Sequence, residues 1–360
     1  MLEGPSQYEH HDVAVVGGGV IGLAVAWRAA QRGLRTVVLD AGEPGAWQHA
    51  AGMLAPVTEA EFGEDALLAL GLRAAEGFPR FCAELADASG RDPGLRPTGT
   101  LVVARDRDEA DELERLLEYR RSLGLEVERL RPSQARRAEP ALAPTVRLAL
   151  DVPGDAAVDP RRLVAALADA CERAGVELRR ERVAPADVAR LPAERVVVAA
   201  GAWSGELGAL PVRPVKGQIM RLRDPHGQDL VTRTIRTREG YLVPRGGGRY
   251  VLGATVEERG WDTAPTAGAT FELIRDLAEV VPGVLELEIE ELGAGLRPGT
   301  PDNLPAIGEA GGLVWATGHY RNGILLADVT AAAVVSVLAG DGLPDWAAAC
   351  DAARFAEVPA

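Results

Sequence analysis

The fold is decided by residues 11–40, which read HDVAVVGGGVIGLAVAWRAAQRGLRTVVLD. A short apolar run, VAVV, ends in glycines at positions 17, 19 and 22, and apolar residues then recur at helical spacing. This order predicts a strand, a tight turn and a helix. We expect Gly17 to permit the turn, Gly19 to let the backbone approach a pyrophosphate, and Gly22 to let helix and strand pack closely. The pattern predicts an adenine dinucleotide at the helix N-terminus, and the alternative is a glycine-rich turn beside an ordinary buried strand.

A carboxylate follows the second predicted strand, which spans residues 35–39. Asp40 stands at the carboxyl end of this strand, about 20 residues after the glycines, where it can accept hydrogen bonds from ribose hydroxyls. The same carboxylate would repel a 2′-phosphate, and neither Ala41 nor Gly42 offers a cation to offset the repulsion. The sequence therefore disfavours NADP.

The composition argues against several classes of partner. The chain has 360 residues and a formal net charge of -14, whereas nucleic acid and anionic membranes need a basic protein surface. It contains no run of about 18 apolar residues and no signal-peptide pattern. Cys82, Cys171 and Cys350 form no CxxC pair, and the five histidines lack metal-ligand spacing. We therefore expect a cytoplasmic protein without a metal, membrane or nucleic acid partner.

The strand and helix signals predict two interleaved domains. The apolar run at residues 195–200 is typical of a central strand in a parallel sheet, because both of its faces would be covered. Residues 213–254 alternate like antiparallel strands, with a hairpin turn at 245–248. We expect an α/β plus α+β fold with a discontinuous Rossmann-like cofactor domain and a mainly antiparallel-sheet substrate domain. The expected ranges are 1–90, 150–212 and 294–360 for the cofactor domain, and 91–149 and 213–293 for the substrate domain.

Four separated segments together resemble the D-amino-acid oxidase and sarcosine oxidase superfamily of flavin-dependent amine oxidases. They are GGGVIG at 17–22, AAGAWS at 199–204, GLRPGT at 295–300 and GHYRNGILLA at 318–327. The resemblance covers nearly the whole chain and is closest to the glycine oxidases of thiamine biosynthesis. It implies FAD rather than NAD as the cofactor. Some relatives attach FAD through a cysteine, and the C-terminal motifs here contain none, so we expect noncovalent binding.

The resemblance also implies a grip on a substrate carboxylate by an arginine and a tyrosine. Arg297 matches the arginine, and a guanidinium can make a bidentate contact that lysine cannot reproduce. Tyr241 matches the tyrosine. The alternatives are a surface ion pair for the arginine and a half-buried strand residue for the tyrosine. The expected pocket also includes Met53, Arg321 and Val256, and the last of these replaces the methionine common in glycine oxidases.

The FAD contacts are expected to come from all four motifs and from the small-residue loop after Asp40. The amides of residues 319–324, which precede the last helix, are expected to face the flavin ring and stabilise negative charge there. In that small-residue loop, Trp47, Gln48 and His49 stand where relatives have smaller residues, so phosphate contacts are expected to differ there. The expected contact residues are Gly17, Gly19, Val20, Ile21, Gly22, Asp40, Ala50, Ala51, Gly52, Met53, Val183, Ala200, Gly201, Trp203, Arg297, His319, Tyr320, Arg321, Asn322, Gly323 and Ile324.

The reaction implied by the resemblance is hydride transfer from the α-carbon of an amino acid to FAD. Glycine is the expected substrate, with sarcosine and small D-amino acids next. The expected products are the imine, its hydrolysis products glyoxylate and ammonia, and hydrogen peroxide from O2. No general base is needed, because the neutral amine lone pair assists the departure of the hydride. A homo-oligomeric assembly is left open.

Three further questions stay open from the sequence. One alternative is a flavin dehydrogenase that passes electrons to a quinone or a carrier protein, although the sequence has no membrane-binding hydrophobic or basic stretch. Another is a noncatalytic flavoprotein or interaction module that keeps only the fold, and the intact GLRPGT and GHYRNG loops argue against it. Lys216, the single lysine of the chain, is interpreted either as a result of codon bias or as a flavin neighbour that assists oxygen reduction.

Overall fold

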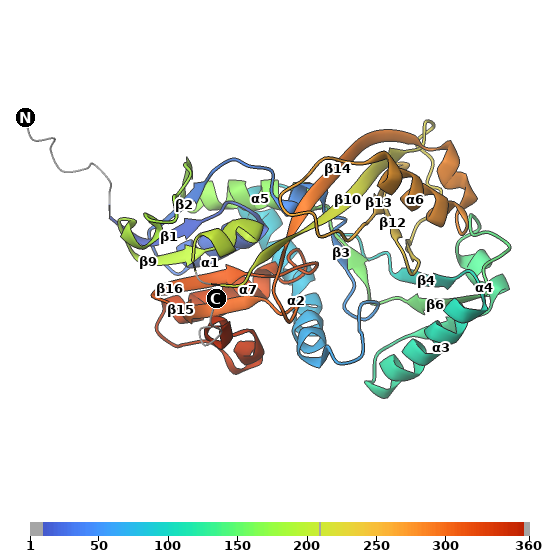
Figure 1. The fold of residues 1–360 in the computed structure, drawn as a ribbon, viewed down its shortest axis with the longest axis horizontal. Helices are drawn as coiled ribbons and strands as arrows, with labels where there is room; N and C mark the ends of the chain where they lie inside the picture. The colour runs from blue at the N-terminus through green and yellow to red at the C-terminus, as the bar shows by residue number, and fades with distance from the viewer. Residues whose placement is uncertain (1–9, 209, 356–360) are drawn as a thin grey trace, which may run out of the picture.

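The computed structural model describes residues 10–208 and 210–355, which fold into two halves that lie side by side (Figure 1). Each half is built on its own sheet, and the long strands β10 and β14 pass between them. No helix in the described part of the chain is long and apolar enough to cross a membrane. The fold class expected from the sequence is confirmed.

The first half contains a six-stranded sheet in the order β15-β16-β9-β1-β2-β8. Its neighbouring strands run parallel, except that β15 pairs antiparallel with β16. Strand β9 lies between β1 and β16, so the apolar run near residue 197 is a central strand, as its composition predicts. The strands are β1 (His11–Val16), β2 (Thr36–Asp40), β8 (Glu177–Arg180), β9 (Ala193–Val198), β15 (Ala306–Ala310) and β16 (Leu313–Thr317).

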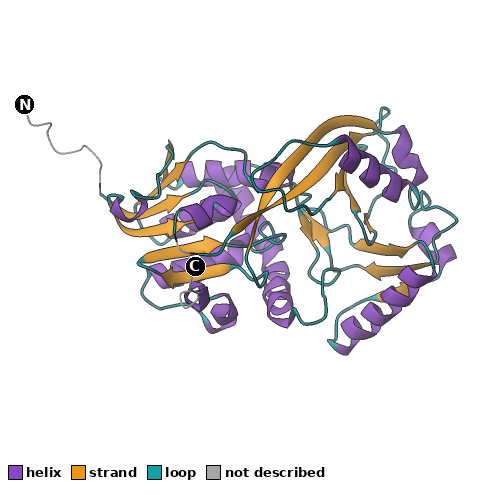
Figure 2. Ribbon diagram, viewed as in Figure 1, coloured by secondary structure: helices purple, strands orange, loops and turns teal. Residues whose placement is uncertain are grey.

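Three helices, α1, α5 and α7, pack against this sheet, and a fourth, α2, packs on α5 and α7. Together they form the largest hydrophobic core of the described residues, and Figure 2 shows the helices beside the strands. Helix α1 is buried nearly all round, because it packs against α5 and α7 as well as the sheet. Helix α5 begins where its sequence predicts, since the Asp159 side chain accepts hydrogen bonds from the N–H groups of Arg161 and Arg162. The helices are α1 (Val20–Gln31), α2 (Asp65–Ser89), α5 (Pro160–Arg173) and α7 (Ala327–Leu338).

The second half contains an eight-stranded sheet in the order β14-β10-β13-β12-β11-β4-β6-β5. All its pairs are antiparallel except β11 with β4. Strand β14 crosses the expected domain boundary at 293/294 and carries GLRPG back toward the first half. Likewise, β6 crosses the boundary expected at 149/150. The strands are β4 (Thr100–Ala104), β5 (Glu128–Leu130), β6 (Leu148–Val152), β10 (Arg213–Arg223), β11 (Thr234–Arg236), β12 (Tyr241–Gly246), β13 (Arg249–Gly253) and β14 (Glu288–Gly299).

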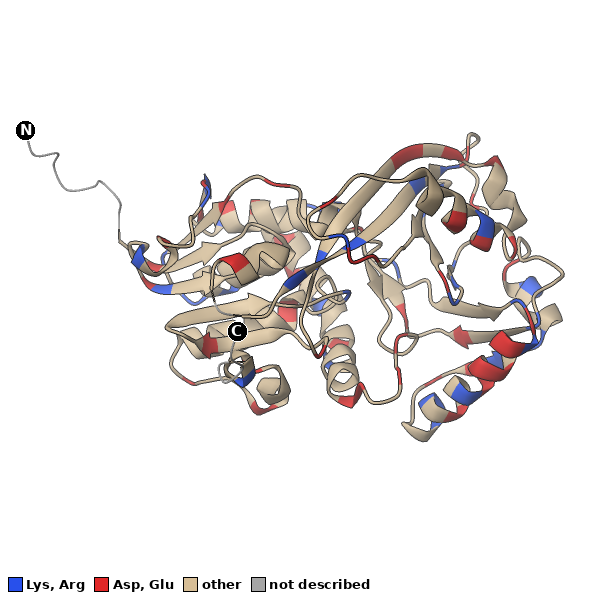
Figure 3. Ribbon diagram, viewed as in Figure 1, with Lys and Arg blue, Asp and Glu red and all other residues tan. Residues whose placement is uncertain are grey.

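Three helices lie beside the second sheet, and acidic and basic residues are interspersed along the longest of them, α3 (Figure 3). Helix α4 ends before Pro140, because the residue that precedes a proline is disfavoured in helical geometry. These helices are α3 (Arg107–Ser122), α4 (Pro132–Ala138) and α6 (Ala267–Ala278). The shorter elements are β3 (Met53–Leu54), β7 (Ala156–Ala157), η1 (Ala46–His49), η2 (Val188–Arg190), η3 (Gly201–Glu206), η4 (Pro282–Glu286), η5 (Asp345–Cys350) and η6 (Ala352–Phe355).

Candidate active site

A cavity of about 660 Å³ runs from the glycine turn of the first half to the β12 and β14 strands of the second. It is lined by the turn after β1, the end of β2, the loop around η1, the start of η3 and the loop before α7. The carboxyl ends of the central parallel strands therefore open into the cavity, which is where open α/β sheets bind ligands. All predicted site residues line the cavity except Gly22 and Asn322.

The glycine turn is shaped by two close approaches of the backbone. Gly17 has φ +111°, and a Cβ atom there would lie 2.4 Å from the carbonyl oxygen of Ala199. A Cβ atom on Gly22 would lie 1.9 Å from the carbonyl oxygen of Gly17. Gly22 therefore serves the packing of α1 on the turn, and does not contact the cavity.

Asp40 lies at the cavity wall and is fixed by two backbone donors. Its Oδ2 atom accepts a hydrogen bond from the Gly18 N–H at 2.6 Å, and its Oδ1 atom accepts one from the Gly42 N–H at 2.7 Å. A carboxylate has about four acceptor positions. Asp40 is thus oriented by the turn and keeps acceptor capacity for the hydroxyls of a ribose.

The loop around η1 is held from outside the cavity by three arginines. Arg161 Nε and Arg221 Nη2 each donate to the Gln48 carbonyl oxygen at 3.1 Å, and Arg245 donates to the carbonyl oxygen of Ala51. None of the three lines the cavity. Burial lowers the pKa of Arg245 to about 10, so it remains charged at neutral pH. These charge-assisted bonds hold the loop at Gln48 and at Ala51, and the residues of 50–53 face the cavity.

Arg297 reaches the cavity from β14 with one edge of its guanidinium anchored. Its Nη1 atom donates to the carbonyl oxygens of Thr255 at 3.0 Å and Lys216 at 3.3 Å. Its Nη2 and Nε atoms have no hydrogen-bond partner among the described residues. A Cβ atom on Gly217 would lie 2.3 Å from the guanidinium nitrogens, so any larger residue there would displace the guanidinium from this position. The free edge can bind a planar anion in bidentate fashion.

Tyr241 lies on β12 and contributes to the same cavity. A Cβ atom on its cross-strand partner Gly253 would lie 2.8 Å from the Tyr241 hydroxyl oxygen. Burial raises the pKa of Tyr241, so the hydroxyl stays protonated at neutral pH and can donate a hydrogen bond. Met53 and Val256 line the cavity nearby, and Val256 is 59% exposed at its rim.

The loop before α7 provides fewer free amides than the sequence suggests. The Tyr320 N–H donates to the Pro298 carbonyl oxygen at 2.9 Å, and the Asn322 N–H donates to that of His319 at 2.8 Å. The expectation that the amides of 319–324 face the ligand is therefore wrong for Tyr320 and Asn322, because the loop folds back on β14 and on itself. His319, Tyr320, Arg321, Gly323 and Ile324 line the cavity, whereas Asn322 does not.

His319 is a neutral wall residue. Its Nε2 atom lies 2.9 Å from the Thr330 hydroxyl oxygen, and its side chain is buried. Burial lowers the pKa of His319 to about 3, so the imidazole carries no charge at neutral pH.

Two segments complete the cofactor end of the cavity. Val183 lies beside the end of β2, and Ala200, Gly201 and Trp203 lie at the start of η3. The Trp203 ring stacks on that of Trp261, with ring centroids 5.5 Å apart.

Lys216 is not a cavity residue, in contrast to the interpretation that placed it beside the flavin. Its Nζ atom donates to Asp262 Oδ2 and to the Ala264 carbonyl oxygen, both at 2.7 Å, and its side chain is fully buried. Alternation along β10 directs Gly217 to the cavity and Lys216 to the opposite face. The Lys216 side chain thus holds the turn at residues 262–264, and the Lys216 backbone pairs with Glu257, two residues after the Arg297 acceptor Thr255.

Sequence reasoning missed Gly217 and the charged residues Glu59, Arg236, Arg238 and Glu239, which all line the cavity. No motif contains them. Arg236 could have been found only from strand register, since it pairs with Tyr241 across β11 and β12.

The chain matches the family model described as FAD dependent oxidoreductase (DAO) over residues 12–337. It is 36% identical over 353 residues to the glycine oxidase of Geobacillus kaustophilus (strain HTA426), covering 91% of this chain and 93% of that protein. It is 34% identical over 345 residues to the bifunctional protein ThiO/ThiG of Trichormus variabilis (strain ATCC 29413 / PCC 7937), covering 91% of this chain but 52% of that protein. The crystal structure of the Geobacillus kaustophilus glycine oxidase matches with a TM-score of 0.89 and 34% identity, covering 96% of this chain and 99% of the other.

Proposed function

Because the chain belongs to the DAO family of FAD-dependent oxidoreductases, we propose that it oxidises glycine. It is a FAD-dependent amino acid oxidase. The proposed reaction converts glycine, O2 and water to glyoxylate, ammonia and hydrogen peroxide. Sarcosine and small D-amino acids are proposed as further substrates. The likeness to ThiO/ThiG supports a place in thiamine biosynthesis.

The observation that carries this proposal is the half-anchored guanidinium of Arg297. Its Nη1 atom is held by two carbonyl oxygens, and its remaining N–H groups lie in the same cavity as the glycine turn and the Tyr241 hydroxyl. A carboxylate bound there would lie between the two halves of the molecule, next to the expected position of a dinucleotide cofactor.

The residues at the other end of the cavity fit FAD. The backbone approaches at Gly17 leave no room for a side chain, and the Asp40 carboxylate retains acceptor positions toward the cavity. When bound, FAD supplies the hydride acceptor and returns the electrons to O2. We propose noncovalent binding, because Cys82, Cys171 and Cys350 are all buried and none lines the cavity.

The protein's own contribution is to bind and orient the substrate. Arg297 and Tyr241 would hold the carboxylate, so that one C–H bond of the α-carbon points toward the cofactor. His319 is neutral and places no cation at that point of the cavity wall. Hydride departure is assisted by the lone pair of a neutral substrate amine. We therefore assign no general base.

The test is a peroxide assay on purified holoprotein with glycine, sarcosine and small D-amino acids. The proposal expects peroxide with glycine and no added electron acceptor. Oxidation that requires an added acceptor would instead identify a dehydrogenase, and no oxidation under either condition would identify a noncatalytic flavoprotein.

Replacing Tyr241 by phenylalanine is expected to raise the KM for glycine about 10- to 100-fold, because one hydrogen bond to a charged group is worth about 1.5–3 kcal/mol. Since burial raises the Tyr241 pKa, the hydroxyl stays protonated, and the KM ratio between variant and wild type should stay constant from about pH 6 to 9. The measurement is KM for both proteins across this range. A ratio that falls to one near pH 8 would show that the hydroxyl ionises there.

Replacing Arg245 by methionine is expected to weaken FAD binding about 10-fold or more, because the Ala51 carbonyl loses its charged donor. The Tm of the FAD-free protein should not fall, since Nε and Nη1 of this buried guanidinium have no hydrogen-bond partner among the described residues. Titration of the FAD-free protein with FAD provides the dissociation constant. Arg249→Met is the control, because that side chain is 63% exposed on the next strand. An FAD affinity within twofold of wild type would exclude a role for Arg245 in holding the loop.

Two further proposals concern organisation. The buried thiols support a reducing, cytoplasmic environment. We also propose that residues 1–90, 150–212 and 294–360 form the FAD-binding domain and that 91–149 and 213–293 form the substrate domain.

A further inference from the structure

We propose that Arg236 forms a second carboxylate-binding position beside Tyr241, so that the enzyme also oxidises amino acids that carry a second carboxylate. This inference rests on the proposed function, because it assumes that Arg297 and Tyr241 bind the first carboxylate. The second carboxylate could be carried by a substituent on the amine or by the side chain of a D-amino acid.

Strand register brings Arg236 to the substrate. Arg236 on β11 lies directly opposite Tyr241 on β12, and directly opposed residues project from the same face of a sheet. The guanidinium carbon of Arg236 lies 5.7 Å from the centroid of the Tyr241 ring. Both residues line the cavity. Tyr241 thus has Arg236 on its ring and the free edge of Arg297 in the same cavity.

The Arg236 guanidinium has no carboxylate or hydrogen-bond partner among the described residues, and it lies against the Tyr241 ring instead. A partly buried guanidinium without an acceptor is available for a ligand oxygen. Arginine suits this task because its planar fork matches a carboxylate.

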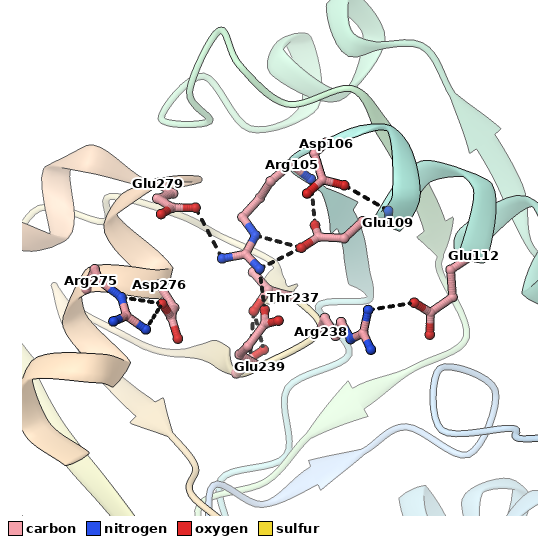
Figure 4. Close-up of polar contacts among 11 residues, drawn as sticks. Arg105, Asp106, Glu109, Glu112, Thr237, Arg238, Glu239, Arg275, Asp276 and Glu279 are labelled. Carbon is pink, nitrogen blue, oxygen red and sulfur yellow. Dashed lines mark hydrogen bonds and ion pairs between the residues drawn. The ribbon is translucent and has the colours of Figure 1, made fainter. Parts of the chain in front are cut away.

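The next charged residues along the chain are different, because the protein neutralises them (Figure 4). Arg238 pairs with Glu112 at 3.3 Å, and Glu239 pairs with Arg105 at 2.6 Å. Arg105 also binds Glu109 and Glu279, which ties α3, the 237–240 turn and the end of α6 together. The turn after Arg236 is therefore fixed, and its charges are balanced without a ligand.

The charged residues that line the substrate end of the cavity carry a net positive charge. Arg236, Arg297 and Arg321 line the cavity without an ion pair among the described residues, and Glu59 is the unpaired carboxylate on that wall. Glu61 lies outside the cavity and also interacts electrostatically with Arg236 and Arg321, but its strongest interaction with a positive charge is with Arg120. The single carboxylate of glycine balances one arginine. A second carboxylate would balance another.

The experiment compares wild type, Arg236→Gln and Arg236→Lys as FAD-loaded proteins. The substrates are glycine, N-(carboxymethyl)glycine and D-aspartate, and their oxidation is measured as peroxide formation. N-(carboxymethyl)glycine would yield glyoxylate, glycine and hydrogen peroxide from O2 and water, and D-aspartate would yield oxaloacetate, ammonia and hydrogen peroxide. Calorimetric titration with the inert ligands acetate and malonate measures binding without turnover. Arg107→Gln is the charge-matched control, because Arg107 is 91% exposed and does not line the cavity.

In wild type we expect malonate to bind at least 10-fold more tightly than acetate. In Arg236→Gln, the ratio of malonate to acetate affinity should fall at least 10-fold. The kcat/KM of at least one dicarboxylate, relative to that of glycine, should also fall at least 10-fold. Arg236→Lys should recover part of both losses. Loss confined to N-(carboxymethyl)glycine assigns the second carboxylate to the amine substituent, and loss confined to D-aspartate assigns it to the side chain.

Equal binding of acetate and malonate by wild type would overturn the inference even if the variants do not fold. If malonate is preferred but glycine is not oxidised, the subsite stands and the proposed glycine oxidation fails.

Discussion

Replacing Arg297 by alanine is expected to raise the KM for glycine at least 100-fold while FAD remains bound. The substitution removes a partly buried, charge-assisted contact with the substrate carboxylate, and loss of such a contact costs about 3–5 kcal/mol. A difference of about 1.4 kcal/mol changes an equilibrium tenfold, so the expected increase is on the order of 10²- to 10³-fold. Steady-state peroxide formation measures KM, and the visible spectrum measures the FAD content of the same sample.

The control for this prediction separates charge from geometry. Arg297→Lys keeps the positive charge but loses the fork, so its KM should lie between those of wild type and Arg297→Ala. Arg107→Ala removes an exposed arginine outside the cavity and should behave as wild type. A normal KM in Arg297→Ala would remove this residue from the substrate site.

Replacing Gly22 by alanine is expected to abolish FAD binding. The added methyl group would lie 1.9 Å from the carbonyl oxygen of Gly17, a separation that no rotamer can relieve because both atoms are fixed by backbone. Helix α1 would have to move away from the turn, and the amides of its first turn would leave the phosphates. We expect the purified variant to contain less than about a tenth of the wild-type FAD, with a lower Tm, because the steric conflict lies in the main core.

Gly77 provides a matched control for the same chemical change. It lies inside α2, and a Cβ atom there would meet nothing within 4 Å. Alanine is favoured over glycine in a helix interior by about 1 kcal/mol, so Gly77→Ala should retain FAD and have an equal or higher Tm. Full FAD content and a wild-type Tm in Gly22→Ala would contradict the role given to this glycine.

The local part of the fold could be predicted from the sequence because its signals are short-range. The strand, turn and helix of residues 11–40, the cap at Asp159 and the hairpin at residues 245–248 each depend on neighbours within a few positions. The family motifs added the cofactor and the class of reaction, because they mark where separate segments approach one ligand.

The rest of the site depends on contacts between distant segments. Gly217 leaves space for Arg297 only because β10 and β14 pair in one register, and Lys216 turns away to Asp262 for the same reason. Arg245 reaches Ala51 across 194 positions in the chain. The prediction that the amides of 319–324 face the ligand is partly wrong because the Tyr320 amide bonds to the carbonyl oxygen of Pro298, a contact that the local sequence pattern does not reveal.

The most direct test of the central claim is to mix the FAD-loaded protein with glycine in the absence of oxygen and record the visible spectrum. If the cavity holds FAD beside an Arg297-bound amino acid, the flavin absorbance should bleach, and it should return with release of hydrogen peroxide when O2 is admitted. A spectrum that stays unchanged with glycine, sarcosine and small D-amino acids would contradict the account.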